Sequence, residues 1–133
     1  MSLRNVALAL LLAAASALSL SCSAPPGASA SGTAWKATLT WSPGVIAPLG
    51  PTALRLRLID HQGNALDAED LQAEAVMASM SHAREAVTFR SAGLGEYEAT
   101  HSFSMDGRWE LRLRGGLNGG SFIATFQVPV GSF

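Results

Sequence analysis

The sequence predicts an all-β protein: an antiparallel β-sandwich of about seven strands, preceded by a signal peptide and a flexible linker. Two observations predict the sandwich. Apolar and polar residues alternate over short segments throughout the region 35–133, as they do in strands with one buried face. Clusters of Gly, Pro, Asn and Asp separate these segments, as is typical of all-β folds. The region 35–133 has the length of one domain with a single core.

The first 21 residues are organised like a secretory signal peptide. Arg4 precedes the apolar segment 6–20, which consists almost entirely of Ala and Leu, and small residues follow it. This apolar segment is shorter than the roughly 20 residues that a helix needs to cross a bilayer. We therefore expect export to the cell envelope or periplasm, without a transmembrane helix in this segment.

Cys22 directly follows the apolar segment and is the only cysteine of the chain, so a disulfide within one chain is excluded. Residues 18–22, LSLSC, resemble a bacterial lipobox, although a leucine stands two positions before the cysteine instead of three. We predict that Cys22 is lipidated and is the only membrane anchor of the mature chain. The alternative is a cysteine discarded or left free by ordinary cleavage near Ala24 or Ala30.

Residues 22–34 are mainly Ser, Ala, Pro, Gly and Thr and show no apolar periodicity, which predicts a flexible tether. The chain contains 9 Lys+Arg and 10 Asp+Glu. Because nucleic-acid binding requires a basic patch, we expect no nucleic-acid partner. Neither a G-x-S-x-G elbow nor an H-E-x-x-H motif occurs, and we expect a protein without enzymatic activity.

The predicted domain, 35–133, consists of strands joined by turns. Strands are expected around residues 35–41, 54–58, 71–79, 87–89, 97–103, 109–114 and 122–128. Two of these segments alternate Leu with Arg, so their arginines (Arg55, Arg57, Arg112 and Arg114) should form solvent-exposed faces. Asp106-Gly107 predicts a tight hairpin turn, whereas 115–120 should be a loose loop. The segment 66–74 has a helix-forming composition, but the neighbouring strands favour a short connection into a strand.

A set of soft metal donors stands out in the second half of the chain. Met77, Met80 and His82 occur close together, and Met105 follows just before a later strand. Neutral thioether and imidazole groups favour cuprous copper over hard cations. Residues two apart share a strand face and residues three apart do not, so Met80 and His82 can converge, whereas Met77 joins them only if the chain turns near Ala78. The alternative is that the methionines fill gaps in the core.

Three motifs follow one another in the chain. They are M-x-x-M-x-H over 77–82, G-x-Y over 95–97, and F-x-M-x-G-x-W-x-L over 103–111. Over about residues 54–113, this order resembles the YtkA-like/FixH-like family of small exported domains. The resemblance implies an immunoglobulin-like β-sandwich outside the cytoplasm, linked to copper handling or to assembly of respiratory oxidases. The chain departs from the family pattern at Ala78, where a proline is common, and no further Met and His cluster follows.

Two classes of function follow from these observations. The first is an exported, lipid-anchored domain that binds cuprous copper through Met80, His82, Met105 and Met77. The second is a metal-free domain that docks onto an envelope or respiratory-complex protein. The methionine side chains distinguish the two classes, because ligands must converge at an exposed edge, whereas core residues are buried among Leu and Phe. His101 falls on the same strand face as residues that we expect to be buried, so it should be a histidine hydrogen-bonded to its neighbours.

The lipidation of Cys22 can be tested on the full chain. Mass spectrometry of the membrane fraction should detect a mature chain that begins at a lipid-bearing Cys22. A soluble mature chain that begins after Ala24 or Ala30 would contradict lipidation and leave the prediction of export intact.

Overall fold

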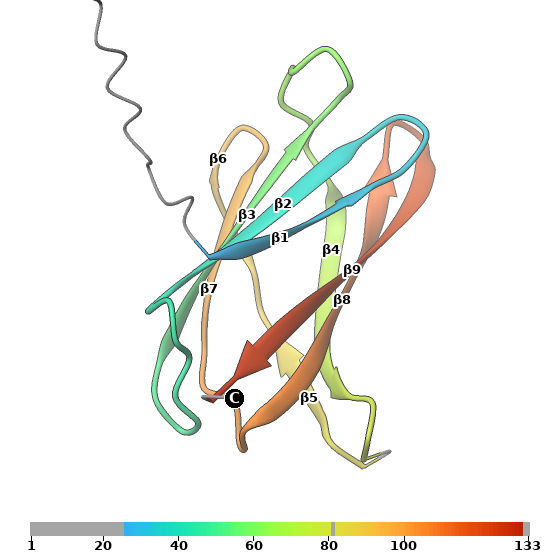
Figure 1. Ribbon diagram of the computed structural model, residues 1–133. Coiled ribbons are helices and arrows are strands. Elements are labelled where there is room, and N and C mark those ends of the chain that lie inside the picture. The colour runs from blue at the N-terminus through green and yellow to red at the C-terminus, as the bar shows by residue number, and fades with distance from the viewer. Residues whose placement is uncertain (1–25, 81, 132–133) are drawn as a thin grey trace, which may run out of the picture.

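The computed structural model describes residues 26–80 and 82–131, which form two antiparallel sheets packed face to face (Figure 1). The first sheet consists, in spatial order, of β1 (Gly27–Ser31), β2 (Lys36–Ser42), β3 (Thr52–Ile59), β7 (Glu96–His101) and β6 (Arg90–Gly93). The second consists of β5 (Arg84–Val87), β4 (Glu69–Met77), β8 (Gly107–Leu117) and β9 (Gly120–Val130). The predicted all-β sandwich is confirmed, with nine strands in place of about seven.

The strand order is that of a seven-stranded immunoglobulin-like sandwich with two additional strands. In such domains, strands A, B, E and D form one sheet and strands C, F and G form the other. Here β2, β3, β7 and β6 take the first set of places, and β4, β8 and β9 take the second. β1 extends the first sheet beyond β2, and β5 extends the second beyond β4.

The core lies between the two sheets and consists of their inward-facing residues. Every second residue of β3 and β8 is buried over most of each strand, which is the alternation visible in the sequence. The largest fully buried side chains include Trp109, Phe103 and Phe126. The arginines of β3 and β8 are exposed on the outer faces, as predicted.

β1 lies within the segment that the sequence predicts to be a flexible linker. It pairs with β2 along its whole length, and Ala28 and Ala30 pack against the core. The linker prediction for 22–34 is therefore wrong over 27–31, because main-chain pairing forms this strand without an apolar periodicity. The signal segment and Cys22 lie outside the described residues. Within the described ranges, no helix has the length and apolarity needed to span a membrane.

Two connections differ from the predictions. Asn118 and Gly119 form a two-residue turn between β8 and β9, in place of the predicted loose loop over 115–120. Their φ angles are 50° and 82°, and a type I′ hairpin turn requires positive φ at both positions. Asp106-Gly107, in contrast, lies where the chain passes from β7 in one sheet to β8 in the other. The predicted hairpin at this position is therefore wrong.

The G-x-Y motif fixes the β3–β4 connection against the sheet. Gly95 has a φ of 71°, and a Cβ at this position would lie 2.7 Å from the carbonyl oxygen of Leu58. The N–H of Gly95 donates to the carboxylate of Asp67 at 3.0 Å. The hydroxyl of Tyr97 accepts the N–H of Ala68 at 2.7 Å. Both motif residues therefore have structural roles at the end of the sandwich that lies at the top in Figure 1.

Trp109 provides a direct test of the fold. Its side chain is fully buried, and its ring centroid lies 5.5 Å from that of Phe103. Trp109→Ala should lower the free energy of unfolding by about 3–5 kcal/mol, because it removes buried apolar surface and leaves a cavity. Chemical denaturation measures the loss. A change of about 0.5 kcal/mol or less, typical of a surface substitution, would contradict the placement of this side chain.

Candidate functional site

Three connections at one end of the sandwich carry the predicted metal ligands or adjoin them. They are the β2–β3 (43–51), β4–β5 (78–83) and β7–β8 (102–106) connections, at the lower end in Figure 1. The N–H of Leu49 in the first donates to the carbonyl oxygen of Phe103 in the third at 2.7 Å. The side chain of Met77, just before the second, lies against Gly107, where a Cβ would be 2.7 Å from the methionine methyl carbon.

Met77 is the last residue of β4 and is part of the core. It lies opposite Trp109 in the β4–β8 pairing, and its sulfur packs close to the backbone of Gly107. The chain does turn directly after it, at Ala78. The thioether nevertheless stays inside the sandwich, as its phase with the buried Ala75 indicates.

Met80 and His82 lie on a tight turn and not on a strand. The N–H of Met80 donates to the carbonyl oxygen of Met77, and the N–H of Ala83 donates to that of Met80, each at 3.1 Å. β4 ends before Ala78, so strand alternation does not place the two side chains on one face, contrary to the prediction. Met80 is 47% exposed and His82 is also exposed. The turn therefore presents both a thioether and an imidazole to solvent.

Met105 occupies an intermediate position in the β7–β8 connection. It is partly buried and packs against the core, while its carbonyl oxygen accepts the indole N–H of Trp109 at 3.0 Å. Among the described residues, no group of three or more His, Cys, Asp and Glu side chains is placed to hold a metal ion.

A polar pair joins the strand that follows this turn to the opposite sheet. The Oε2 atom of Glu85 in β5 lies 3.1 Å from Nε2 of His101 in β7, and Oε1 accepts the N–H of Ser104 at 2.9 Å. The side chains of His101 and Glu85 are only 13% and 19% exposed. The rings of His101 and Phe103 pack edge to face, with centroids 4.8 Å apart. His101 is thus a hydrogen-bonded histidine, as predicted.

Glu85 is a positioning residue that sequence reasoning missed. It lies three residues after His82 and fixes the start of β5 relative to the other sheet. One signal for it exists in the sequence. Glu85 stands two residues before Val87, which is buried, and residues two apart on a strand share a face. That phase places Glu85 inward, where a carboxylate needs a partner.

The order of the motifs and the fold agree with a known family. A family model described as YtkA-like matches residues 29–114. The chain belongs to the YtkA-like family. The match begins within β1 and ends in β8, so it includes all three motifs. The YtkA-like resemblance is therefore confirmed, whereas the FixH-like relationship stays a prediction.

Solved structures resemble the YtkA-like domain at low sequence identity. The crystal structure of a DUF4426 family protein from Pseudomonas aeruginosa PAO1 is similar with a TM-score of 0.60 and 10% identity, over 81% of this chain and 97% of that chain. The crystal structure of an engineered protein gives a TM-score of 0.48 and 15% identity, over 71% of this chain and 20% of the other. The first supports the sandwich fold. Among curated proteins, none matches the chain.

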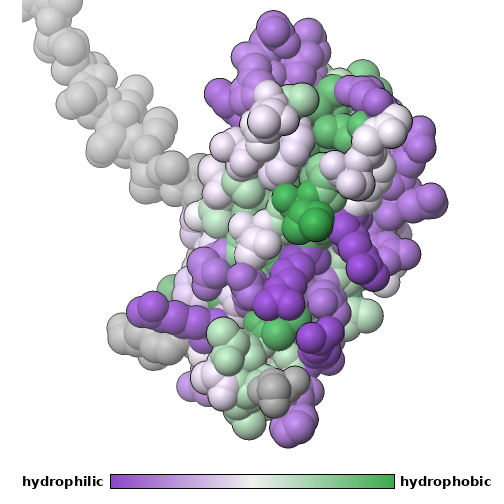
Figure 2. Space-filling view, turned by 90° about the vertical axis from the view of Figure 1, so that its right-hand side faces the viewer, coloured by the Kyte–Doolittle hydropathy of each residue, from purple (hydrophilic) through white to green (hydrophobic). Residues whose placement is uncertain are grey.

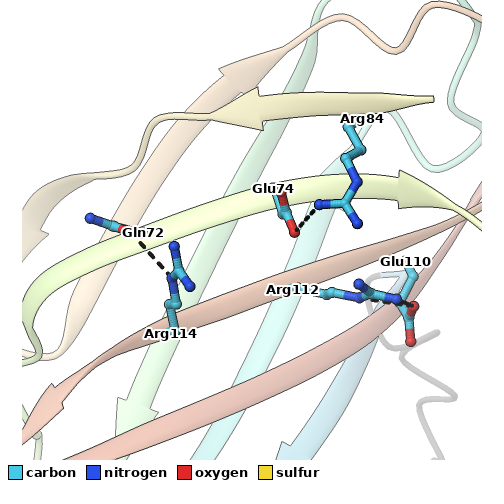
Figure 3. A network of polar contacts seen from close by, with 6 residues as sticks. All are labelled: Gln72, Glu74, Arg84, Glu110, Arg112 and Arg114. Carbon is cyan, nitrogen blue, oxygen red and sulfur yellow. Dashed lines mark hydrogen bonds and ion pairs between the residues drawn. The ribbon is translucent and has the colours of Figure 1, made fainter. Parts of the chain in front are cut away.

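The outer face of the second sheet of the YtkA-like domain carries paired polar side chains. Figure 3 shows them: Gln72, Glu74, Arg84, Glu110, Arg112 and Arg114. Arg112 donates two hydrogen bonds to Glu110, at 3.1 and 2.8 Å. Each of the three arginines has a partner within 3.5 Å, which lowers their availability to an outside anion.

Figure 2 shows one side of the molecule, on which hydrophobic residues form small patches separated by hydrophilic ones.

The core position of Met77 can be tested by stability. Met77→Leu should change the free energy of unfolding by less than about 1.5 kcal/mol, because the two side chains have similar volumes. Met77→Ala should cost about 2–5 kcal/mol, because it leaves a cavity. Chemical denaturation of the three proteins gives both values. If Met77→Ala were as stable as the parent protein, the methionine would not be a core residue.

Proposed function

We propose that the chain is an exported, lipid-anchored YtkA-like domain of the cell envelope that binds cuprous copper at the β4–β5 turn. One observation supports this proposal. Met80 and His82 are the residues of the M-x-x-M-x-H motif with exposed side chains, whereas Met77 packs in the core. Packing in the core accounts for Met77, whereas the side chains of Met80 and His82 are open to solvent and accessible to a metal ion. Met105, in the neighbouring connection, is the third donor of the proposed site.

The chemistry of these donors suits cuprous ion. Thioether and imidazole are neutral ligands, and soft sulfur ligands select Cu(I). A thioether needs no deprotonation and remains a ligand in a mildly acidic compartment, whereas imidazole coordinates only when it is unprotonated. Because Met80 and His82 are exposed, a second protein can reach the ion, which suits transfer of copper more than its storage.

The residues next to the turn hold its two ends in place. Met77 fixes the end of β4 through its packing against Gly107. Glu85 fixes the start of β5 through His101 and Ser104. In this proposal, the contacts of Met77 and Glu85 position the turn, and Met80 and His82 supply the metal ligands without catalysis.

A metal-free docking domain is the second candidate. It is favoured by the packing of Met77 and Met105 against the core, since two of the four predicted ligands then have structural roles. In this case, the exposed Met80 would contact an envelope or respiratory-complex protein, and methionine is common on adaptable binding surfaces.

Titration with Cu(I) under reducing conditions, against a chromophoric chelator, separates the two candidates. His82→Ala should weaken copper binding by more than about tenfold, the lower end of what even outer-shell substitutions cost. Met80→Ala and Met105→Ala should each weaken it less, because a single thioether is the weaker donor. Met77→Leu is the matched control, since it removes a thioether of the same motif from the core and should leave affinity unchanged.

Equal affinities of the parent protein, His82→Ala and Met80→Ala would contradict the copper site. The docking domain would then be the better account. A loss of affinity in Met77→Leu as large as in Met80→Ala would contradict the proposed assignment of ligands.

A further inference from the structure

We propose that the β2–β3 connection contacts the lipid bilayer through Val45 and Leu49. This contact turns the end of the sandwich that carries Met80 and His82 toward the membrane. The inference rests on the lipid anchor of the proposed function and extends it from attachment to orientation.

The β2–β3 connection exposes apolar side chains and contains no charged residue. Val45 is 69% exposed and Leu49 is 76% exposed. The segment 43–51 contains no Asp, Glu, Lys or Arg, and it contains three prolines. Exposed apolar patches mark surfaces that contact a membrane or a protein. The absence of charge within the segment favours contact with the apolar part of a bilayer, where a charged side chain is costly to bury.

The connection is held in a defined conformation that points these side chains outward. Ile46, beside Val45, is fully buried, and its carbonyl oxygen accepts the N–H of Gly131 at 2.6 Å. The N–H of Leu49 is bonded to the carbonyl oxygen of Phe103. Leu49 has a φ of 64°, which is rare for a bulky residue and is easier for glycine. The turn therefore tolerates leucine at a conformational cost, and residues in such conformations cluster at functional surfaces.

The proposed tether enters the domain next to this connection. The N–H of Trp41 donates to the carbonyl oxygen of Pro26 at 3.2 Å, and a Cβ at Gly44 would lie 3.3 Å from the Pro26 ring. Cys22 precedes Pro26 by four residues, which span at most about 14 Å. A lipid on Cys22 thus keeps the β2–β3 connection close to the headgroups. The other end of the sandwich lies farther away by the length of β3, roughly 26 Å for its eight residues.

The same contact gives the proposed copper site a direction. Leu49 is hydrogen-bonded to Phe103 in the β7–β8 connection, and Met77 packs against Gly107 just after that connection. The β2–β3, β7–β8 and β4–β5 connections therefore share one end of the sandwich. When the first of them rests on the bilayer, Met80 and His82 face the surface of proteins embedded in the same membrane.

The test uses the full chain, purified from membranes with its anchor and reconstituted into vesicles of phosphatidylcholine and phosphatidylglycerol. Single cysteines are introduced as Val45→Cys, Leu49→Cys and Leu94→Cys and labelled with an environment-sensitive fluorophore. A lipidated Cys22 has no free thiol, so only the introduced cysteine reacts. Leu94 is the matched control, because it is 69% exposed, as Val45 is, but lies in the β6–β7 turn at the opposite end.

Lipids that carry a spin label near the headgroup should quench the fluorophore at positions 45 and 49 several-fold more than at position 94. Leu49→Gly, introduced into the Val45→Cys protein, removes the apolar side chain. Glycine adopts the left-handed conformation of this position more readily than leucine does. The substitution should leave the midpoint of thermal unfolding unchanged or raise it, while it lowers quenching at position 45. If Leu49 had a purely structural role, the substitution would lower the midpoint of thermal unfolding and leave quenching at position 45 unchanged.

Equal quenching at positions 45 and 94, in a chain whose lipid is verified by mass, would overturn the inference and leave the anchor intact. A mature chain without lipid on Cys22 would overturn the anchor and, with it, this orientation. Protection of position 45 from aqueous iodide in native membranes but not in vesicles would assign the connection to a protein partner and also overturn the inference.

Discussion

The burial of Trp109 between the two sheets organises the end of the molecule to which both proposals refer. Its partner across the β4–β8 ladder is Met77, which it faces at the point where β4 ends. Its indole N–H is bonded to the carbonyl of Met105, and its ring packs near Phe103. Phe103 in turn accepts the N–H of Leu49. One buried side chain thus connects the β4–β5, β7–β8 and β2–β3 connections through neighbours in direct contact.

This packing divides the motif residues into two groups by their physical roles. Gly95 and Tyr97 bind the β3–β4 connection, and Trp109 with its neighbours closes the other end of the core. Met80 and His82 lie on a turn that the core holds at both ends, yet their side chains are exposed. In the proposed copper site, the core would hold the backbone of the turn in place, so that binding needs less ordering of the main chain.

The strands and the core were predictable because each strand has one buried face. Apolar residues at every second position of the sequence therefore lie side by side in the core. The same phase places Met77 with Ala75 in the core. β1 was not predictable, because main-chain pairing with β2 and two small alanines form it. The positions of Met80 and His82 depend on where β4 ends. The pairing of Glu85 with His101 joins distant strands of different sheets, and no local pattern in the sequence specifies such a contact.

We propose that the exposed β4–β5 turn, and not the core, supplies sulfur and nitrogen to cuprous copper. X-ray absorption at the copper edge of the Cu(I)-loaded full chain tests it most directly. We expect a coordination shell that contains both sulfur and nitrogen scatterers, with the nitrogen lost in His82→Ala and the sulfur reduced in Met80→Ala. A shell of nitrogen and oxygen alone, or one that neither substitution changes, would contradict it.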